Sequence, residues 1–284
     1  MQTLNFMLLF LNDFQLWHRS GIKFVDTLLK RANKMKKIEG DVQGKKVAAR
    51  LLTALVLGLG LVSTASSAVT LTGNVGYVSD YTFRGISQTN EGMAIQGGLT
   101  LNDESGFYLS SWGSNITFGQ GSMELDILAG WTGKITEELS TDVGVMQYRY
   151  PNGDNATDQF NFVELYGKLI YKDFVFGLAY SNDYFGTDVD GYYYLSADYT
   201  YPVMDKLSLL AHLSYNKFED NTQYTTFLAA GPVTGSGYVD WSFGVGTTLL
   251  DSAVQLKYVG TDIDDSAECA ICDNRAVLSI TKSF

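Results

Sequence analysis

The sequence predicts an all-β protein, an antiparallel up-and-down transmembrane β-barrel of about 12 strands, with 10 to 14 as the expected range. Three features predict it: an export signal, segments of about ten residues that alternate between apolar and polar side chains, and a final alternating strand that ends on Phe284. Alternating segments of about ten residues have the length expected of strands that cross a bilayer at a tilt. We expect the Phe284 strand to be the signal that the barrel-assembly machinery reads.

The segment 35–68 has the three parts of a secretory signal peptide. Basic residues come first, the apolar run LLTALVLGLGLV (51–62) follows, and small residues end the segment at Ala68. This apolar run is too short to span a bilayer as a helix. We predict cleavage after Ala68, which leaves 69–284 as the mature barrel. Residues 1–34 are interpreted as a mis-assigned start or a leader extension, without a role in the mature protein.

The predicted mature chain is strongly acidic and rich in aromatic residues. Its 10 Lys and Arg stand against 27 Asp and Glu, so its net charge is −17. Such a chain repels the phosphates of nucleic acids, so we expect no nucleic-acid partner. All 18 tyrosines lie in this part, and the whole chain has only 3 prolines. This composition favours a protein of many strands over a helical or disordered one.

The two cysteines, Cys269 and Cys272, form a CxxC motif in AECAICD. Behind a signal peptide such a pair favours a local disulfide, with a free dithiol as the alternative. A zinc site would need two further ligands, and His212 is the one histidine of the mature part. We therefore predict no bound metal, and no cofactor motif is found.

Strand-like segments recur along the mature chain. We predict strands over 70–79, 93–102, 107–116, 122–131, 139–149, 160–171, 174–182, 191–201, 207–216, 238–249, 253–261 and 275–284. In SMELDILAGW (122–131) Met123 and Ile127 share one face, while Glu124 and Asp126 share the other. A charge that faces lipid costs a few kcal/mol. In a membrane barrel these two acids must therefore face inward.

The connections between the predicted strands alternate in length. If the first strand starts in the periplasm, the even-numbered connections are short turns, such as KD (172–173) and PVMDK (202–206). The odd-numbered ones, apart from 117–121, are longer and acidic, such as 217–237 and 262–274. Short periplasmic turns and long external loops are typical of outer-membrane barrels.

Tyrosines gather near the ends of the predicted strands, in pairs such as Tyr148 and Tyr150 or Tyr199 and Tyr201. We interpret them as an aromatic girdle at the membrane interfaces. The alternative is the ordinary preference of aromatic residues for strands.

The segment 73–116 carries the most specific motif of the chain. Its core is VSDYTFRGISQ (78–88), followed by AIQGG (94–98) and GFYLSSWGSN (106–115). These residues resemble the TorF family of porin-like proteins, catalogued also as the Gcw_chp domain of unknown function. Further along the chain the resemblance rests on strand pattern, spacing and Phe284. It implies an outer-membrane barrel that acts as a channel, without an assigned substrate.

Charged side chains on the inward parity, together with Arg84, are the candidates to line a pore. They are Arg84, Glu124, Asp126, Asp142, Glu164, Lys168, Asp198, His212, Asp240, Lys257 and Arg275. Acids predominate, so we expect passive passage of small solutes with a preference for cations. The alternative is a network of paired charges that plugs the barrel. For Arg84 we favour a structural role, in which its hydrogen bonds to carboxylates hold the first loop and it touches no solute.

Enzymatic activity is a competing expectation, because some outer-membrane barrels are hydrolases. Ser208 and Ser214 share the face of His212, but the local sequence supplies no identifiable group to orient the histidine. We therefore predict no catalytic residues and no enzyme. A closed structural or surface-interaction barrel is a further alternative. We expect the protein in the outer membrane of a Gram-negative bacterium, with lipid and an unidentified small solute as partners.

Overall fold

The computed structural model describes six stretches of the chain: 68–117, 121–151, 160–186, 189–228, 235–263 and 269–284. The predicted leader and nearly all of the predicted signal peptide lie outside the described residues, and they stay predictions.

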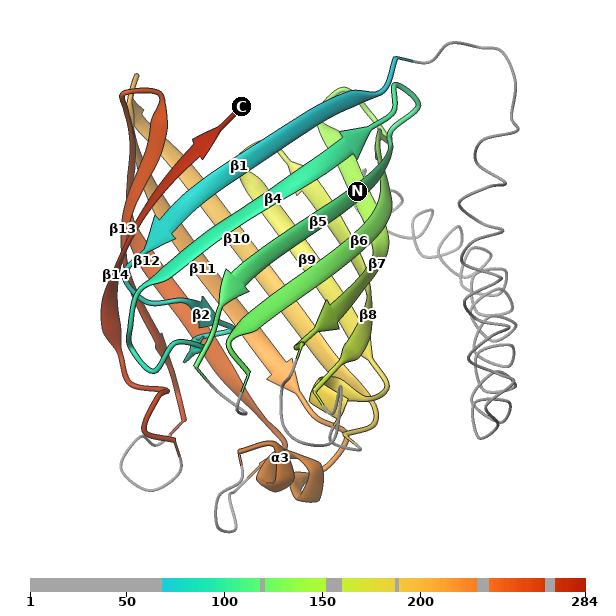
Figure 1. Cartoon of the computed structure of the whole chain (residues 1–284), viewed down its shortest axis with the longest axis vertical. Coiled ribbons are helices and arrows are strands. Elements are labelled where there is room, and N and C mark those ends of the chain that lie inside the picture. The colour runs from blue at the N-terminus through green and yellow to red at the C-terminus, as the bar shows by residue number, and fades with distance from the viewer. Residues whose placement is uncertain (1–67, 118–120, 152–159, 187–188, 229–234, 264–268) are drawn as a thin grey trace, which may run out of the picture. The chain divides into compact units, whose positions relative to one another are not determined.

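Within the described residues, twelve strands close into one antiparallel barrel in which each strand pairs with its neighbours along the chain (Figure 1). β1 pairs with β4 on one side and with the last strand, β14, on the other. The barrel strands are β1 (Thr70–Val78), β4 (Ala94–Asn102), β5 (Phe107–Asn115), β6 (Met123–Lys134), β7 (Leu139–Arg149), β8 (Phe162–Tyr171), β9 (Phe174–Ser181), β10 (Tyr192–Met204), β11 (Leu207–Lys217), β12 (Gly237–Leu249), β13 (Ser252–Thr261) and β14 (Arg275–Ser283). The predicted fold class and strand count are confirmed.

Two of the predicted turns are shorter than expected. β6 continues to Lys134 and β10 to Met204, so the chain turns later at both places. The register of β10 against β11 shifts between Pro202 and Met204. A proline cannot donate a hydrogen bond to the sheet, and such a residue is tolerated at a bulge or at the end of a strand. The strand therefore passes the proline that the sequence pattern suggested as a turn.

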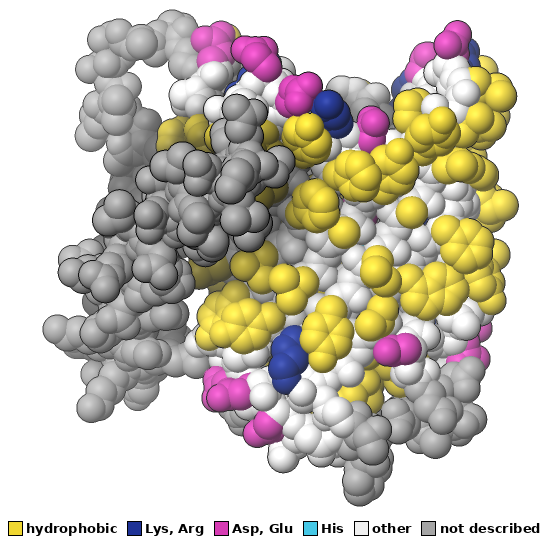
Figure 2. Space-filling view, turned by 180° about the vertical axis from the view of Figure 1, so that it is seen from behind, with side chains coloured by type: hydrophobic (Ala, Val, Ile, Leu, Met, Phe, Trp, Pro, Cys, Tyr) yellow, Lys and Arg dark blue, Asp and Glu magenta, His cyan; other side chains and the backbone are white. Residues whose placement is uncertain are grey.

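The side chains of each strand alternate between the barrel interior and its outer wall. On β6, Met123 and Ile127 are 52% and 39% exposed, whereas Glu124 and Asp126 are 1% and 5% exposed. The other strands follow the same rule, and large apolar residues such as Leu213 on β11 are exposed on the outside. Figure 2 shows these apolar side chains over the middle of the wall. The outer wall is thus apolar and the interior carries the charges.

The connections sort the barrel into two ends. The end with the short connections, here called the turn end, includes the two-residue turns between β8 and β9, β10 and β11, and β12 and β13. The opposite end, here called the loop end, carries the other described elements: β2 (Thr82–Phe83), β3 (Ile86–Ser87), η1 (Tyr184–Gly186) and α3 (Asn221–Leu228). Within the described residues, no helix is long and apolar enough to cross a membrane.

A cluster of packed side chains fills the interior at the loop end. It includes Tyr148, Tyr150, Phe162, Tyr184, Phe185, Tyr192, Phe218 and Tyr238, together with residues of the β2–β3 segment. Tyr148 and Tyr150 are 5% and 1% exposed, so the interpretation of this pair as part of an interfacial girdle was wrong. The outward tyrosine Tyr201, which is 51% exposed, does lie on the outer wall. Some aromatic residues near strand ends therefore pack inside the barrel, and others lie on its outer wall.

Candidate functional site in the barrel interior

The first connection folds back into the barrel as a short hairpin, formed by β2 and β3 (Figure 1). Its tip is the dipeptide Arg84–Gly85, with φ of 52° and 81°. Positive φ at both central residues matches the primed turns that two-residue hairpins prefer. A Cβ at position 85 would lie 2.5 Å from Cγ2 of Thr261 and 2.8 Å from Cβ of Asp240. The tip thus touches the barrel wall where only glycine fits.

Arg84 fastens the hairpin tip to strand β8. Its Nη2 donates to both carboxylate oxygens of Glu164, at 2.7 and 2.9 Å, and the hydroxyl of Tyr148 donates to Oε2 of Glu164 at 3.0 Å. The Arg84 and Glu164 side chains are 6% and 3% exposed. The guanidinium also lies 4.2 Å from the ring centre of Tyr194. This geometry is the hairpin-holding role that the sequence favoured for Arg84.

The base of the hairpin is held by Asp80. This carboxylate accepts hydrogen bonds from the hydroxyls of Ser87 and Thr89, and Nη1 of Arg275 on β14 donates to its Oδ2 at 2.9 Å. The backbone N–H of Ser87 donates to the carbonyl of Ile271, in the last loop. Arg275 therefore lies on the inner wall as predicted from its parity, but its guanidinium binds Asp80 at the base of the hairpin and the carbonyl of Asp273.

The acids Glu124 and Asp126 of β6 lie beside the hairpin. The hydroxyl of Tyr81 donates to Oε1 of Glu124 at 3.1 Å. Burial raises the pKa of the Tyr81 phenol, and the charges of the two acids raise it further, so this hydroxyl keeps its proton and acts as a donor. Both acids face inward, as predicted, and Glu124 is fully covered by its neighbours.

His212 on β11 lies between two carboxylates from the neighbouring strands. Its Nδ1 is 2.7 Å from Oδ1 of Asp198 on β10, and its Nε2 is 3.1 Å from Oδ1 of Asp240 on β12. Ser214 and Asn216 donate to the other oxygen of Asp240. No group near His212 in the sequence could be predicted to orient it, because its partners come from the neighbouring strands. The short turn between β10 and β11 could have predicted one of these partners, because the pairing of the two strands that it joins places Asp198 opposite His212.

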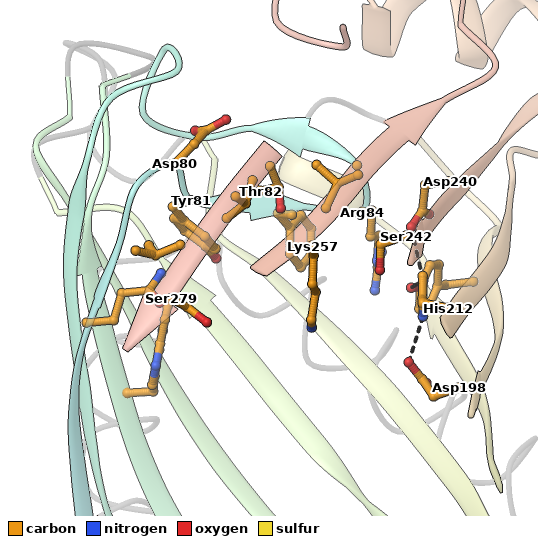
Figure 3. A pocket seen from close by; sticks show the side chains of 18 of the residues that line it. Asp80, Tyr81, Thr82, Arg84, Asp198, His212, Asp240, Ser242, Lys257 and Ser279 are labelled. Carbon is orange, nitrogen blue, oxygen red and sulfur yellow. Dashed lines mark hydrogen bonds and ion pairs between the residues drawn. The ribbon is translucent and has the colours of Figure 1, made fainter. Parts of the chain in front are cut away.

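The barrel interior next to the hairpin contains a cavity of about 630 Å³. Six of the predicted pore-lining residues line it: Arg84, Asp126, Asp198, His212, Asp240 and Lys257. Tyr81, Trp112, Tyr148 and Tyr194 add aromatic surface that the sequence reading did not assign to the interior. Figure 3 shows Lys257 between Tyr81 on one side and the pair of His212 and Asp198 on the other. The cavity therefore combines acids, bases and aromatic rings.

The remaining predicted pore-lining residues lie elsewhere on the inner wall. Glu124, Glu164 and Arg275 contact the hairpin, as described above. Asp142 accepts a hydrogen bond from the hydroxyl of Tyr108 at 2.7 Å, and Nζ of Lys168 lies 5.6 Å from the ring centre of Tyr166. Asp142 and Lys168 face each other on neighbouring strands, β7 and β8, away from the cavity lining.

The structure contains a disulfide between Cys269 and Cys272. It lies in the loop before β14, and the hydroxyl of Thr261 donates to the carbonyl of Cys272. Among the described residues, no group of three or more His, Cys, Asp and Glu side chains is arranged to hold a metal ion.

These observations define a class of protein, a closed antiparallel barrel with an apolar outer wall, a charged interior and a loop folded into the lumen. The chain belongs to the family described as bacterial protein of unknown function (Gcw_chp), which matches residues 62–284. A search of curated proteins found no match.

Several solved structures share the barrel architecture at low sequence identity. One is the KdgM porin, with 12% identity, a TM-score of 0.48 and coverage of 75% of this chain and 99% of that chain. Another is OprD of Pseudomonas aeruginosa, with 12% identity, a TM-score of 0.38 and coverage of 75% and 66%. OccAB3 of Acinetobacter baumannii has 9% identity, a TM-score of 0.39 and coverage of 75% and 64%. These likenesses concern the fold alone.

Proposed function

We propose that the protein spans the outer membrane of a Gram-negative bacterium and is a channel for passive passage of small solutes, with a preference for cations. The observation that carries the proposal is the combination of a closed barrel, an apolar outer wall and a charged interior that holds a cavity. A closed barrel leaves no unpaired strand edge, which is the condition for spanning lipid with strands. A charged, hollow interior is the feature expected of a solute path.

The hairpin of β2 and β3 would set the narrowest part of this path. It lies inside the barrel at the loop end and is held by Glu164 and Arg275. Toward the turn end the inner wall carries small polar side chains, such as Thr100 and Ser110, which bind each other at 2.8 Å. The proposed channel is therefore narrowest at the loop end, where the hairpin and the packed aromatic cluster lie.

Charge supports the preference for cations. Asp80, Asp126, Asp198 and Asp240 line the cavity, against Arg84, His212 and Lys257. The predicted mature chain is acidic as a whole, so positive solutes would gather at its surface. No catalytic step is part of the proposal. Ser214 donates to Asp240, and both ring nitrogens of His212 lie within hydrogen-bond distance of carboxylates.

The test is a planar-bilayer recording on refolded protein 69–284. We expect discrete conductance steps, and a reversal potential in a KCl gradient that shows cation selectivity. Asp198→Asn should reduce this selectivity, because the Asp198 side chain is 48% exposed inside the barrel. Asp251→Asn is the matched control, since Asp251 is 94% exposed in a turn. Folded protein without any conductance would overturn the channel proposal in favour of a closed structural barrel.

A further inference from the structure

We infer that the cavity is a binding site for small zwitterionic solutes, in which Lys257 receives a carboxylate and Asp198 receives an ammonium group. The inference deepens the proposed channel function and rests on it. It names the class of solute that the path would hold, molecules of the amino acid type that carry both charges.

The first step concerns Lys257. Its side chain projects from β13 into the cavity (Figure 3), and within the described residues its Nζ has no carboxylate within 4.0 Å. The other basic groups at the cavity are engaged: Arg84 binds Glu164, and His212 lies between two acids. Lys257 is therefore a half-buried cation that lacks a counter-charge at contact distance. A partly desolvated ammonium favours an anionic ligand.

The second step concerns Asp198. Its Oδ1 is bound by His212, but its side chain is 48% exposed and its Oδ2 makes no hydrogen bond to the described residues. Asp240, by contrast, is 5% exposed and all its acceptor contacts go to His212, Ser214 and Asn216. Asp198 is thus the accessible carboxylate on this wall, held in orientation by His212 and open on its other side.

The third step concerns the spacing of the two charges. The strand registers place Lys257 beside Gly244, Gly244 beside Leu210, and Leu210 beside Thr200, two residues from Asp198. The two backbones are three strand spacings apart, or about 14 Å. Both side chains line one cavity, so the gap between the charges is narrower than the gap between the backbones. In this row Gly244 carries no side chain, so it adds no bulk next to Lys257.

The fourth step concerns the rest of the cavity. Tyr81 and Trp112 line it from the hairpin and from β5, and their rings pack edge to face at 5.5 Å. In the strand order β5 is separated from β13 and from β10 by at least three strands on either side, so the rings lie across the lumen from the two charges. Such rings offer apolar contact to the carbon chain of a solute, as in other ligand pockets.

The experiment compares three probes of one length on the folded barrel: 6-aminohexanoate (a zwitterion), 6-aminohexanamide (a cation) and hexanoate (an anion). Isothermal titration calorimetry in detergent measures binding without any need for conduction. We expect 6-aminohexanoate to bind at least about tenfold more tightly than either other probe, because only it satisfies both charges. Equal affinities for the three probes would overturn the inference.

Variants assign the two charges. Lys257→Met should remove the advantage of 6-aminohexanoate over its amide, and Asp198→Asn should remove its advantage over hexanoate. Lys257→Arg should keep the preference, because it keeps the positive charge. Lys206→Met is the control, because it removes a lysine from an exposed turn. A Lys257→Met variant that folds and keeps the full preference would refute the role of Lys257.

The outcome is separable from that of the channel proposal. Block of the single-channel current by 6-aminohexanoate, absent in Lys257→Met, would support both. Zwitterion binding to a barrel that does not conduct would support the site and overturn the channel. Conductance without selective zwitterion binding would overturn the site and leave the channel.

Discussion

Phe284 and Gly73 meet where the two ends of the barrel sheet join. The backbone N–H of each donates to the carbonyl of the other, at 2.9 and 2.8 Å. A Cβ at position 73 would lie 2.7 Å from Cε2 of the Phe284 ring. The terminal aromatic therefore packs over a residue without a side chain, on the neighbouring strand β1. The last residue of the chain is part of the seam that closes the barrel.

Gly73→Val should lower the yield of closed barrel. A valine side chain would occupy the space of the Phe284 ring, and Leu99 lies as close on the other side, at 2.8 Å. The measurement is the fraction of refolded protein that migrates differently before and after boiling on a detergent gel. Gly167→Ala is the control, because its Cβ would meet its nearest neighbour at 3.7 Å. Equal yields for both variants would show that the seam does not need glycine.

Glu164→Gln should destabilise the barrel by about 3–5 kcal/mol, because it leaves the buried Arg84 guanidinium without its counter-charge. We also expect a larger conductance, since the hairpin loses its hold on β8. Urea unfolding followed by tryptophan fluorescence gives the first quantity, and a planar-bilayer recording gives the second. Glu138→Gln removes an exposed ion pair with Lys172 and should change neither. An unchanged unfolding midpoint in Glu164→Gln would contradict the assignment.

Gly85→Val should push the hairpin tip off the barrel wall and widen the path, while the barrel still closes. The new side chain would meet Thr261 and Asp240, and position 85 has a φ of +81° that disfavours valine. The readout is a larger single-channel conductance from protein whose gel migration still depends on heating. Gly235→Ala has a φ of +86° but nothing within 4 Å, so it carries backbone strain without a collision. A current identical to that of the parent would show that the hairpin does not limit flow.

Alkaline pH should loosen the loop end. Burial raises the pKa of the Tyr184 phenol from its ordinary 10.0 to about 12. The folded state thus holds this proton more tightly than the unfolded state, so the contribution to stability is complete below pH 10.0. It is lost as the pH rises toward about 12. Ultraviolet titration should show a tyrosine that ionises late in the parent protein and is missing in Tyr184→Phe. Identical titration curves for the two proteins would count against the burial of Tyr184.

The strand plan could be read from the sequence because it depends on local alternation. Residues such as Met123 and Glu124 differ in polarity, and neighbouring side chains on a strand point to opposite faces. An apolar outer wall and a charged interior follow directly, as the exposures of these residues show. The two-residue turn 172–173 was also predicted, because two residues can join antiparallel strands, whereas the turn at 202–206 was predicted too long.

The candidate site was only partly readable. The alternation of side chains along each strand placed Asp198, His212 and Lys257 on the inner face. It could not predict which of these side chains contact one another. Arg84 and Glu164 are 80 positions apart, and their ion pair exists because the first loop folds into the lumen. Tyr148 and Tyr150 lie near a strand end, as tyrosines of an interfacial girdle do. They differ from girdle tyrosines in facing the barrel interior instead of the outer wall.

The local pattern of the sequence predicted export and an acidic chain of alternating strands, because signal peptides and side-chain alternation are properties of short segments. Three features follow only from the folded barrel: the hairpin enters the lumen, Arg84 binds Glu164, and no carboxylate of the described residues lies within 4.0 Å of Nζ of Lys257. These outcomes depend on barrel closure, which brings the walls of distant strands around a single lumen. Phe284 belongs to both levels: its place at the end of a strand is visible in the sequence, but its contact with Gly73 requires the closed sheet.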